Sequence, residues 1–212
     1  MVKVLPGNEA GYRFFSIDKY KALMPQIKDA GLKPMNLADV MKKQLEAINK
    51  NDRKEIYFWL YKFFSTADGV IYPAEQFDLI KVVLDVAMLK NINERTRLSS
   101  GAVILPPQEY DRLDGKEFWN PRFSEKLTRQ EAKNDPIWQY VSRDKPFLDE
   151  YVDAIFKEME RTPPHNSKGM DIYLSSPQKV PTLRPLSIGS INRRFALDGC
   201  DSLETDAQLI GF

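Results

Sequence analysis

Two acidic side chains, Asp68 and Glu75, lie on either side of a glycine turn and could bind a divalent cation. They begin and end the segment Asp-Gly-Val-Ile-Tyr-Pro-Ala-Glu, residues 68–75. Glycine permits a sharp turn of the chain, and a glutamate can give two oxygens to calcium. These two residues are therefore the candidates for a cation site.

The segment resembles the second half of an EF-hand loop, in which an acid, a glycine, an aliphatic residue and a closing glutamate have this spacing. Phe64 and Thr66 occupy the positions of the first and third residues of such a loop, so the entry carboxylate is missing. The pattern is also similar to the helical turn of tellurite-resistance-type domains. In the structural alternative, Asp68 fills a turn and Glu75 favours a helix N-terminus. We expect this structural turn, with no metal and no other cofactor.

Other residue types that carry chemistry are scarce. The chain has one histidine, His165, and one cysteine, Cys200. A two-histidine metal site and an internal disulfide are therefore excluded, and no glycine-rich phosphate loop occurs. Carboxylates near 149–160 are expected on the solvent face of a helix, where they hold no catalytic pair. The sequence predicts a protein that is not an enzyme.

Composition bounds the class of protein. Of 212 residues, 42% are hydrophobic and the net charge is +1. That apolar content suffices for a core, and so small a charge provides no global attraction to nucleic acid or to membranes. The densest apolar run, residues 56–64, is too short to span a bilayer. We expect an intracellular protein, soluble or within a macromolecular assembly, with no membrane contact.

Helical spacing of apolar residues dominates the first part of the chain. It predicts a mainly α fold with minor β, in which Asn36 and Asp52 cap successive helices. The domain is expected to cover residues 1–165, with an irregular insert at about 92–135 in which Phe118 and Trp119 pack a loop. The core helices are predicted at 36–50, 53–64, 73–91 and 146–161.

Residues 166–212 are predicted to form an extended arm and acidic tail, because their charges are sorted into two blocks. Four basic residues and no acidic one occur from Ile172 to Leu197, and four acidic residues and no basic one follow. Such an arm could lie on a neighbouring subunit, although a tail packed on its own domain stays an equal alternative. The expected partner-binding residues of the arm are Leu183, Leu186, Ile188, Ile191, Arg193, Arg194 and Phe195.

The last residues of the chain suggest a separate docking peptide. Gln208, Leu209 and Phe212 resemble the short peptide that docks into sliding clamps, and the acidic lead is similar to the tails of single-stranded-DNA-binding proteins. In both, acidic residues steer and terminal apolar side chains fill a pocket.

The predicted function is that of a non-enzymatic structural or adaptor subunit, whose partners are other protein subunits bound through the C-terminal arm. Deleting the chain from about residue 166 should then leave a folded core that no longer assembles. The alternative is a nucleic-acid-processing accessory protein, in which the basic arm contacts phosphates and the C-terminal peptide docks on a clamp.

Overall fold

The computed structural model describes residues 2–3, 12–76, 78–119, 124–161, 169–176, 178–191 and 194–212; for residues 2, 3, 17, 124, 125, 191 and 194 it describes the backbone alone. Its helices are α1 (Tyr20–Asp29), α2 (Leu37–Lys50), α3 (Arg53–Tyr61), α4 (Ala87–Lys90), α5 (Pro107–Arg112), α6 (Arg129–Asn134), α7 (Pro136–Ser142) and α8 (Lys145–Arg161). Its strands are β1 (Val2–Lys3), β2 (Arg13–Lys19), β3 (Phe64–Tyr72), β4 (Leu79–Val83), β5 (Leu98–Ser99), β6 (Ala102–Ile104), β7 (Lys116–Trp119), β8 (Ser124–Leu127), β9 (Met170–Tyr173), β10 (Thr182–Ile191), β11 (Arg194–Asp198) and β12 (Asp206–Gly211).

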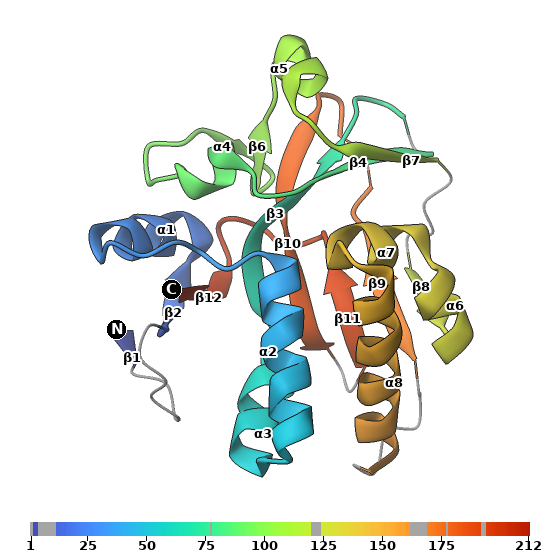
Figure 1. Cartoon of the computed structure of the whole chain (residues 1–212). Coiled ribbons are helices and arrows are strands. Elements are labelled where there is room, and N and C mark those ends of the chain that lie inside the picture. The colour runs from blue at the N-terminus through green and yellow to red at the C-terminus, as the bar shows by residue number, and fades with distance from the viewer. Residues whose placement is uncertain are drawn as a thin grey trace.

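The prediction of a mainly α fold is wrong, because the chain is 40% helical and 30% strand and is built on a large curled sheet. Seven strands follow one another in the order β7-β4-β3-β10-β11-β9-β8, and β6 pairs with the start of β10 and with β5. The pairs are antiparallel except β11 with β9. Figure 1 shows β3 and β10 running through the middle of the molecule.

Helices cover both faces of this sheet and divide the core in two. One apolar cluster joins α2, α3, α7 and α8 to side chains such as Val70 and Tyr72 of β3. The other joins α1 and α4 to Ile71 of the same strand. All nine residues of β3 are buried, as expected for a strand with both faces covered.

One predicted helix is shorter than expected, and another is wrong. The helix predicted at 53–64 ends at Tyr61, and Phe64 begins β3. The helix predicted at 73–91 is replaced by strand β4 and the short helix α4; Phe77 lies outside the described residues. A continuous apolar run fits a buried strand as well as a buried helix, and valine and isoleucine favour the strand.

The amphipathic helices are confirmed. The Asn36 side chain caps α2 by accepting from the Asp39 amide at 2.9 Å, and Asp52 caps α3. A buried polar chain then joins three helices: the Tyr151 hydroxyl donates to Gln44 Oε1 at 2.6 Å, and Gln44 Nε2 donates to the Trp59 carbonyl at 2.9 Å. The insert predicted at 92–135 contains two short helices and four short strands among its described residues.

The predicted C-terminal arm is also wrong as a fold assignment. Residues 170–211 supply β9, β10, β11 and β12, so this segment is part of the sheets rather than an appendage. The alternative of a tail packed on its own domain describes the structure.

The first and last strands meet in a second, three-stranded sheet of order β1-β2-β12. Val2 of β1 and Leu209 of β12 pair with Phe15 of β2 from its two sides. The two ends of the chain therefore lie near each other, on the left of Figure 1. Among the described residues, no helix has the length and apolar character needed to cross a membrane.

Candidate functional site

Asp68, the first cation candidate, is a buried structural residue of β3. Its Oδ2 accepts from the Leu37 amide and its Oδ1 from the Asp85 amide, each at 2.7 Å. Arg143 Nη2 lies 3.5 Å from Oδ1. Burial raises the pKa of this carboxyl, while the two amides and then Arg143 act in the opposite direction. Asp68 thus holds the start of α2, the turn after β4 and the end of α7 together.

Glu75, the second cation candidate, is exposed beyond the end of β3, where the chain turns with φ 56°. Its backbone amide donates to the Gln178 carbonyl at 3.2 Å. The structure therefore does not bring the two carboxylates together. Within the part of the chain that the structure describes, no group of three acidic, histidine or cysteine side chains is placed to hold a metal.

Half of the ten residues expected to bind a partner lie in the core of the protein itself. Leu186, Ile188 and Phe195 belong to one apolar cluster, and Leu183 and Leu209 belong to the other. Of the remaining candidates, Gln208 is half-buried, Phe212 is 44% exposed, the side chains of Ile191 and Arg194 are outside the described part, and Arg193 is outside it entirely.

Two residues of the segments on which the nucleic-acid alternative relies are buried in the fold, whereas the side chains of Arg193 and Arg194 lie outside the described part. Leu209 is fully buried in β12, so it does not project as part of a docking peptide. Arg184 is 6% exposed and donates to the backbone carbonyls of Ser100, Cys200 and Asp201 at 2.7–3.1 Å. Neither residue is placed to contact a clamp or a phosphate backbone.

The acidic and basic blocks meet around Arg184, where the polar side chains fix the connection between β11 and β12. The Ser187 hydroxyl donates to Asp201 Oδ2 at 2.6 Å, and burial raises the pKa of Asp201 to about 6. Asp198 accepts from the Cys200 amide at 2.6 Å. Burial and the neighbouring Asp198 raise the pKa of the Cys200 thiol to about 12. This thiol is therefore not a nucleophile at neutral pH.

Three exposed apolar side chains lie at one end of the sheet, the end opposite to α3 in Figure 1. Ile104 of β6 is 44% exposed, Val180 before β10 is 41% exposed and Trp119 of β7 is 70% exposed. Ile104 pairs with Thr182 and Trp119 pairs with Leu79, so both lie near one end of the strands, and Val180 precedes β10 at that end. Val103 is in register with Glu117 through Leu183, Ile71 and Lys81, so Ile104 and Trp119 point to opposite faces of the sheet, and the surface that they form runs round its end. We call this the rim surface, formed by Ile104, Pro106, Tyr110, Trp119 and Val180.

The rim surface spans the part of the sheet from β6 to β7. Strands β10, β3 and β4 separate β6 from β7. Four strand spacings of about 4.8 Å therefore place Ile104 and Trp119 about 19 Å apart. That distance fits within a standard protein interface, which covers about 800 Å² on each partner.

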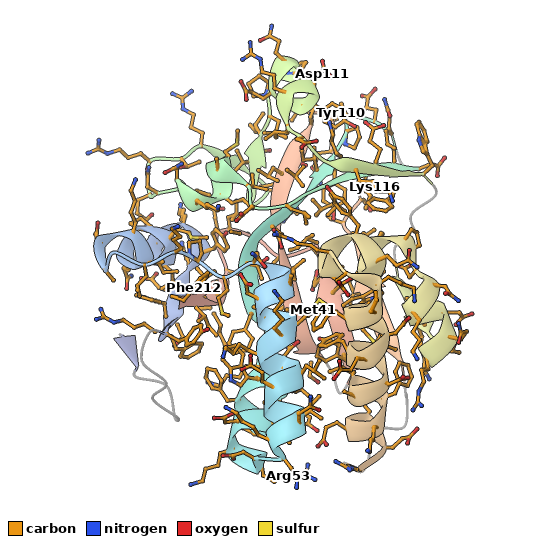
Figure 2. The ribbon with its side chains drawn as sticks, in the orientation of Figure 1. Met41, Arg53, Tyr110, Asp111, Lys116 and Phe212 are labelled. Atoms are coloured by element: carbon orange, nitrogen blue, oxygen red, sulfur yellow. The ribbon has the colours of Figure 1, made fainter. Side chains whose placement is uncertain are left out.

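Helix α5 and three prolines hold this surface in place. The Tyr110 hydroxyl of α5 donates to Glu117 Oε1 at 2.9 Å, and the Lys81 ammonium donates to the Tyr110 carbonyl at 3.1 Å. The Leu105 amide donates to the Pro181 carbonyl at 2.9 Å, and Pro106 and Pro107 follow directly. Figure 2 shows Tyr110 and Lys116 together at the top of the molecule.

Sequence patterns did not predict the rim surface. Phe118 and Trp119 were expected to pack a loop together, and Phe118 is indeed buried, whereas Trp119 is exposed. Neighbouring residues of a strand point to opposite faces, so one aromatic can be buried while the next faces solvent. The exposure of Trp119 could have been predicted only if residues 116–119 had been identified as a strand.

Comparison with known proteins identifies the fold. A solved structure reported as "Accommodation of massive sequence variation in Nanoarchaeota by the C-type lectin fold" is similar over 96% of this chain and 98% of its own, with a TM-score of 0.69 and 13% identity. The chain therefore has the C-type lectin fold, and at this identity the likeness extends to the fold alone. No protein-family model and no curated protein sequence matches the chain.

Proposed function

We propose that this protein is a non-enzymatic binding protein, a structural or adaptor subunit that contacts another protein through the rim surface. One observation carries the proposal: Ile104, Trp119 and Val180 come from distant parts of the sequence and expose apolar side chains at one end of the sheet. The binding surface thus differs from the C-terminal arm that the sequence suggested.

The residue types of the rim surface suit a protein interface. Tryptophan, tyrosine and arginine are the residues that most often dominate binding energy, and Trp119 has most of its surface free to be covered. Tyr110 adds a half-buried aromatic ring. Around them lie exposed side chains of both charges, such as Lys116 and Glu117, which suit the polar margin of such an interface.

The rim surface is also pre-organised. Prolines at 106, 107 and 181 fix backbone angles, and α5 is bonded to Lys81 and Glu117. Little conformational entropy would be lost when a partner covers a surface that is already ordered. This favours recognition by a rigid patch rather than by a loop that folds on binding.

The reactive side chains of the chain support a role without catalysis. Asp68 and Ser187 are fully buried and hydrogen-bonded to other parts of the fold. The raised pKa of Cys200 keeps its thiol protonated at neutral pH. In each case the group stabilises the scaffold.

The solved neighbour lends support of a second kind. That protein is described as accommodating massive sequence variation on the C-type lectin fold. In this chain, Ile104, Trp119 and Val180 lie outside both core clusters, so these three residues could change while the two clusters keep the fold; Tyr110 packs against the second cluster. We propose that in this chain the rim surface is the part that determines which partner binds.

The proposal is tested by affinity capture of partners from the native source, comparing the wild-type chain with the double variant Ile104→Ser, Trp119→Ser. A protein captured by the wild type should be lost with the double variant, with binding weakened at least about thirtyfold if Trp119 contributes 2 kcal/mol. The variant should fold normally, since both side chains are exposed.

Phe212→Ser is the matched control, because Phe212 is 44% exposed like Ile104 but lies at the other sheet. It should capture the same protein as the wild type. A partner that both variants bind equally well would place the binding surface elsewhere and defeat the proposal.

A further inference from the structure

A small hollow lies between α3 and α8, at the foot of the molecule. It has room for about 20 Å³ and is lined by Leu60, Tyr61, Ile155, Glu158, Met159, Ser190 and Phe195. That room is about what one water or the end of one aliphatic side chain occupies. In Figure 2, Arg53 marks this end of the molecule, and Tyr110 marks the rim surface at the other.

Glu158 forms the charged wall of the hollow. Its side chain is 1% exposed, Arg53 Nη1 contacts its Oε1, and Arg161 Nη1 lies 3.7 Å from its Oε2. The two guanidinium groups, at 60% and 43% exposed, therefore share one buried carboxylate. A guanidinium has five N–H donors, so each retains donors that face solvent.

The surface beside the hollow is basic. Lys54 and Lys157 are exposed on the same two helices, in addition to the two arginines. Of the nearby acids, Glu55 is paired with Lys50, Glu160 is paired with Arg129, and Asp52 is exposed and accepts from the Lys54 and Glu55 amides at the start of α3. An incoming carboxylate would thus meet a net positive charge next to an apolar depression.

Aromatic rings extend the apolar wall outward. Tyr61 lines the hollow and stacks on Tyr57 with ring centroids 5.8 Å apart. Tyr57 is 67% exposed, so its ring adds accessible apolar surface next to Tyr61. An occupant of the hollow would therefore find further apolar contact along α3.

We infer that this hollow is a second docking site, which takes an acidic segment of a partner protein. An aliphatic side chain of that segment enters the hollow, and a neighbouring carboxylate is bound by Arg53 and Arg161. The site shares no residue with the rim surface. The protein would then contact partners at two opposite ends.

The test uses the full chain and N-acetyl-leucine as probe, because this molecule carries a carboxylate beside one aliphatic side chain. Methyl NMR signals of Ile155 and Met159 should shift on titration. N-acetyl-leucinamide, which lacks the carboxylate, and N-acetylglycine, which lacks the side chain, should each bind about fivefold more weakly or worse.

Two variants locate the probe. Arg53→Gln with Arg161→Gln should remove the preference for the acid over the amide. Ser190→Leu, which leaves Glu158 and both arginines in place, should block the hollow and abolish the shifts. Arg112→Gln is the matched control, since Arg112 is another exposed, ion-paired arginine and should leave binding unchanged. The rim variant Ile104→Ser, Trp119→Ser should also bind the probe, which separates this site from the proposed function.

The inference is overturned if N-acetyl-leucine leaves the two methyl signals unmoved, or if the amide binds as well as the acid. It is equally overturned if Ser190→Leu binds like the wild type. A single-stranded oligodeoxythymidine is titrated in parallel, because arginines and exposed tyrosines also suit nucleic acid. If the methyl signals of Ile155 and Met159 shift with the oligonucleotide and not with N-acetyl-leucine, the ligand of this site is nucleic acid and the inference of an acidic peptide is wrong.

Discussion

The carboxylate of Asp68 binds the backbone amide of Leu37, 31 positions earlier in the chain, with a hydrogen bond of 2.7 Å. A strand in the middle of the sheet thereby fixes the first residue of α2. Because the same carboxylate also accepts from the Asp85 amide and faces Arg143, one side chain orients three separate segments.

Replacing Asp68 should therefore cost far more stability than replacing Glu75. Asp68→Ala leaves two amides and a guanidinium without their acceptor, and we expect a loss of about 3–5 kcal/mol in the free energy of unfolding. Glu75→Ala, at an exposed position, should change it by less than about 0.5 kcal/mol. Urea denaturation measures both. Equal losses, or a calcium-dependent rise in melting temperature of the wild type, would contradict this assignment.

The stability should depend on pH through Asp201. Burial first, with Asp198 adding repulsion, raises its pKa from 3.8 to about 6, although Ser187 and Arg184 oppose this. An acid whose folded-state pKa is raised stabilises the fold fully below its unfolded pKa and loses this contribution as the pH rises through the folded value. Relative to Asp201→Asn, the wild type should lose up to about 3 kcal/mol between pH 4 and pH 7. Denaturation at both pH values gives the difference. A difference independent of pH would show that Asp201 titrates normally.

Cys200 should react slowly in the folded protein even though part of the residue is exposed. With a thiol pKa of about 12, the thiolate fraction at pH 8 is on the order of 10⁻⁴. Alkylation by iodoacetamide should therefore be about a thousandfold slower than for glutathione, as mass spectrometry would follow. The same chain in guanidinium chloride is the control and should react at the ordinary rate. Fast alkylation of the native protein would refute the raised pKa.

Removing β12 should unfold the domain rather than release an arm. The segment 206–212 carries buried Leu209 and Ile210, and the Phe212 and Lys33 backbones donate to each other at 2.9 Å. Circular dichroism of a chain ending at Thr205 should show loss of cooperative melting. If the truncated chain still folds and melts cooperatively, the result would support the appended tail that the sequence suggested.

Amphipathic helices were predictable here because their pattern has one interpretation. In α2, apolar residues recur every three to four positions and Asn36 supplies the cap, so both the type and the start of the helix are correct. In β3 the alternation typical of strands is lost, since both faces are buried. Ser65, Thr66, Asp68 and Gly69 also interrupt its apolar residues and suggested a turn, so the strand was missed.

The binding surfaces could not be predicted for a different reason. Trp119 and Val180 lie at the same end of the sheet only because β7 pairs with β4, β4 with β3 and β3 with β10. The hollow likewise combines side chains of α3 and α8, nearly a hundred positions apart. No local pattern encodes such long-range register, so a chain whose strands are misassigned gives no clue to either surface.

The pairing of Val2 and Leu209 with the same residue, Phe15, has a topological consequence. Two strand spacings of about 4.8 Å and the short stretch from Leu209 to Phe212 place Val2 and Phe212 within about 15 Å of each other. A short peptide could join them and new ends could be opened in a surface connection, giving a circular permutant. The domain could equally be spliced into a loop of a host protein through this one side, with the rim surface and the hollow still facing outward.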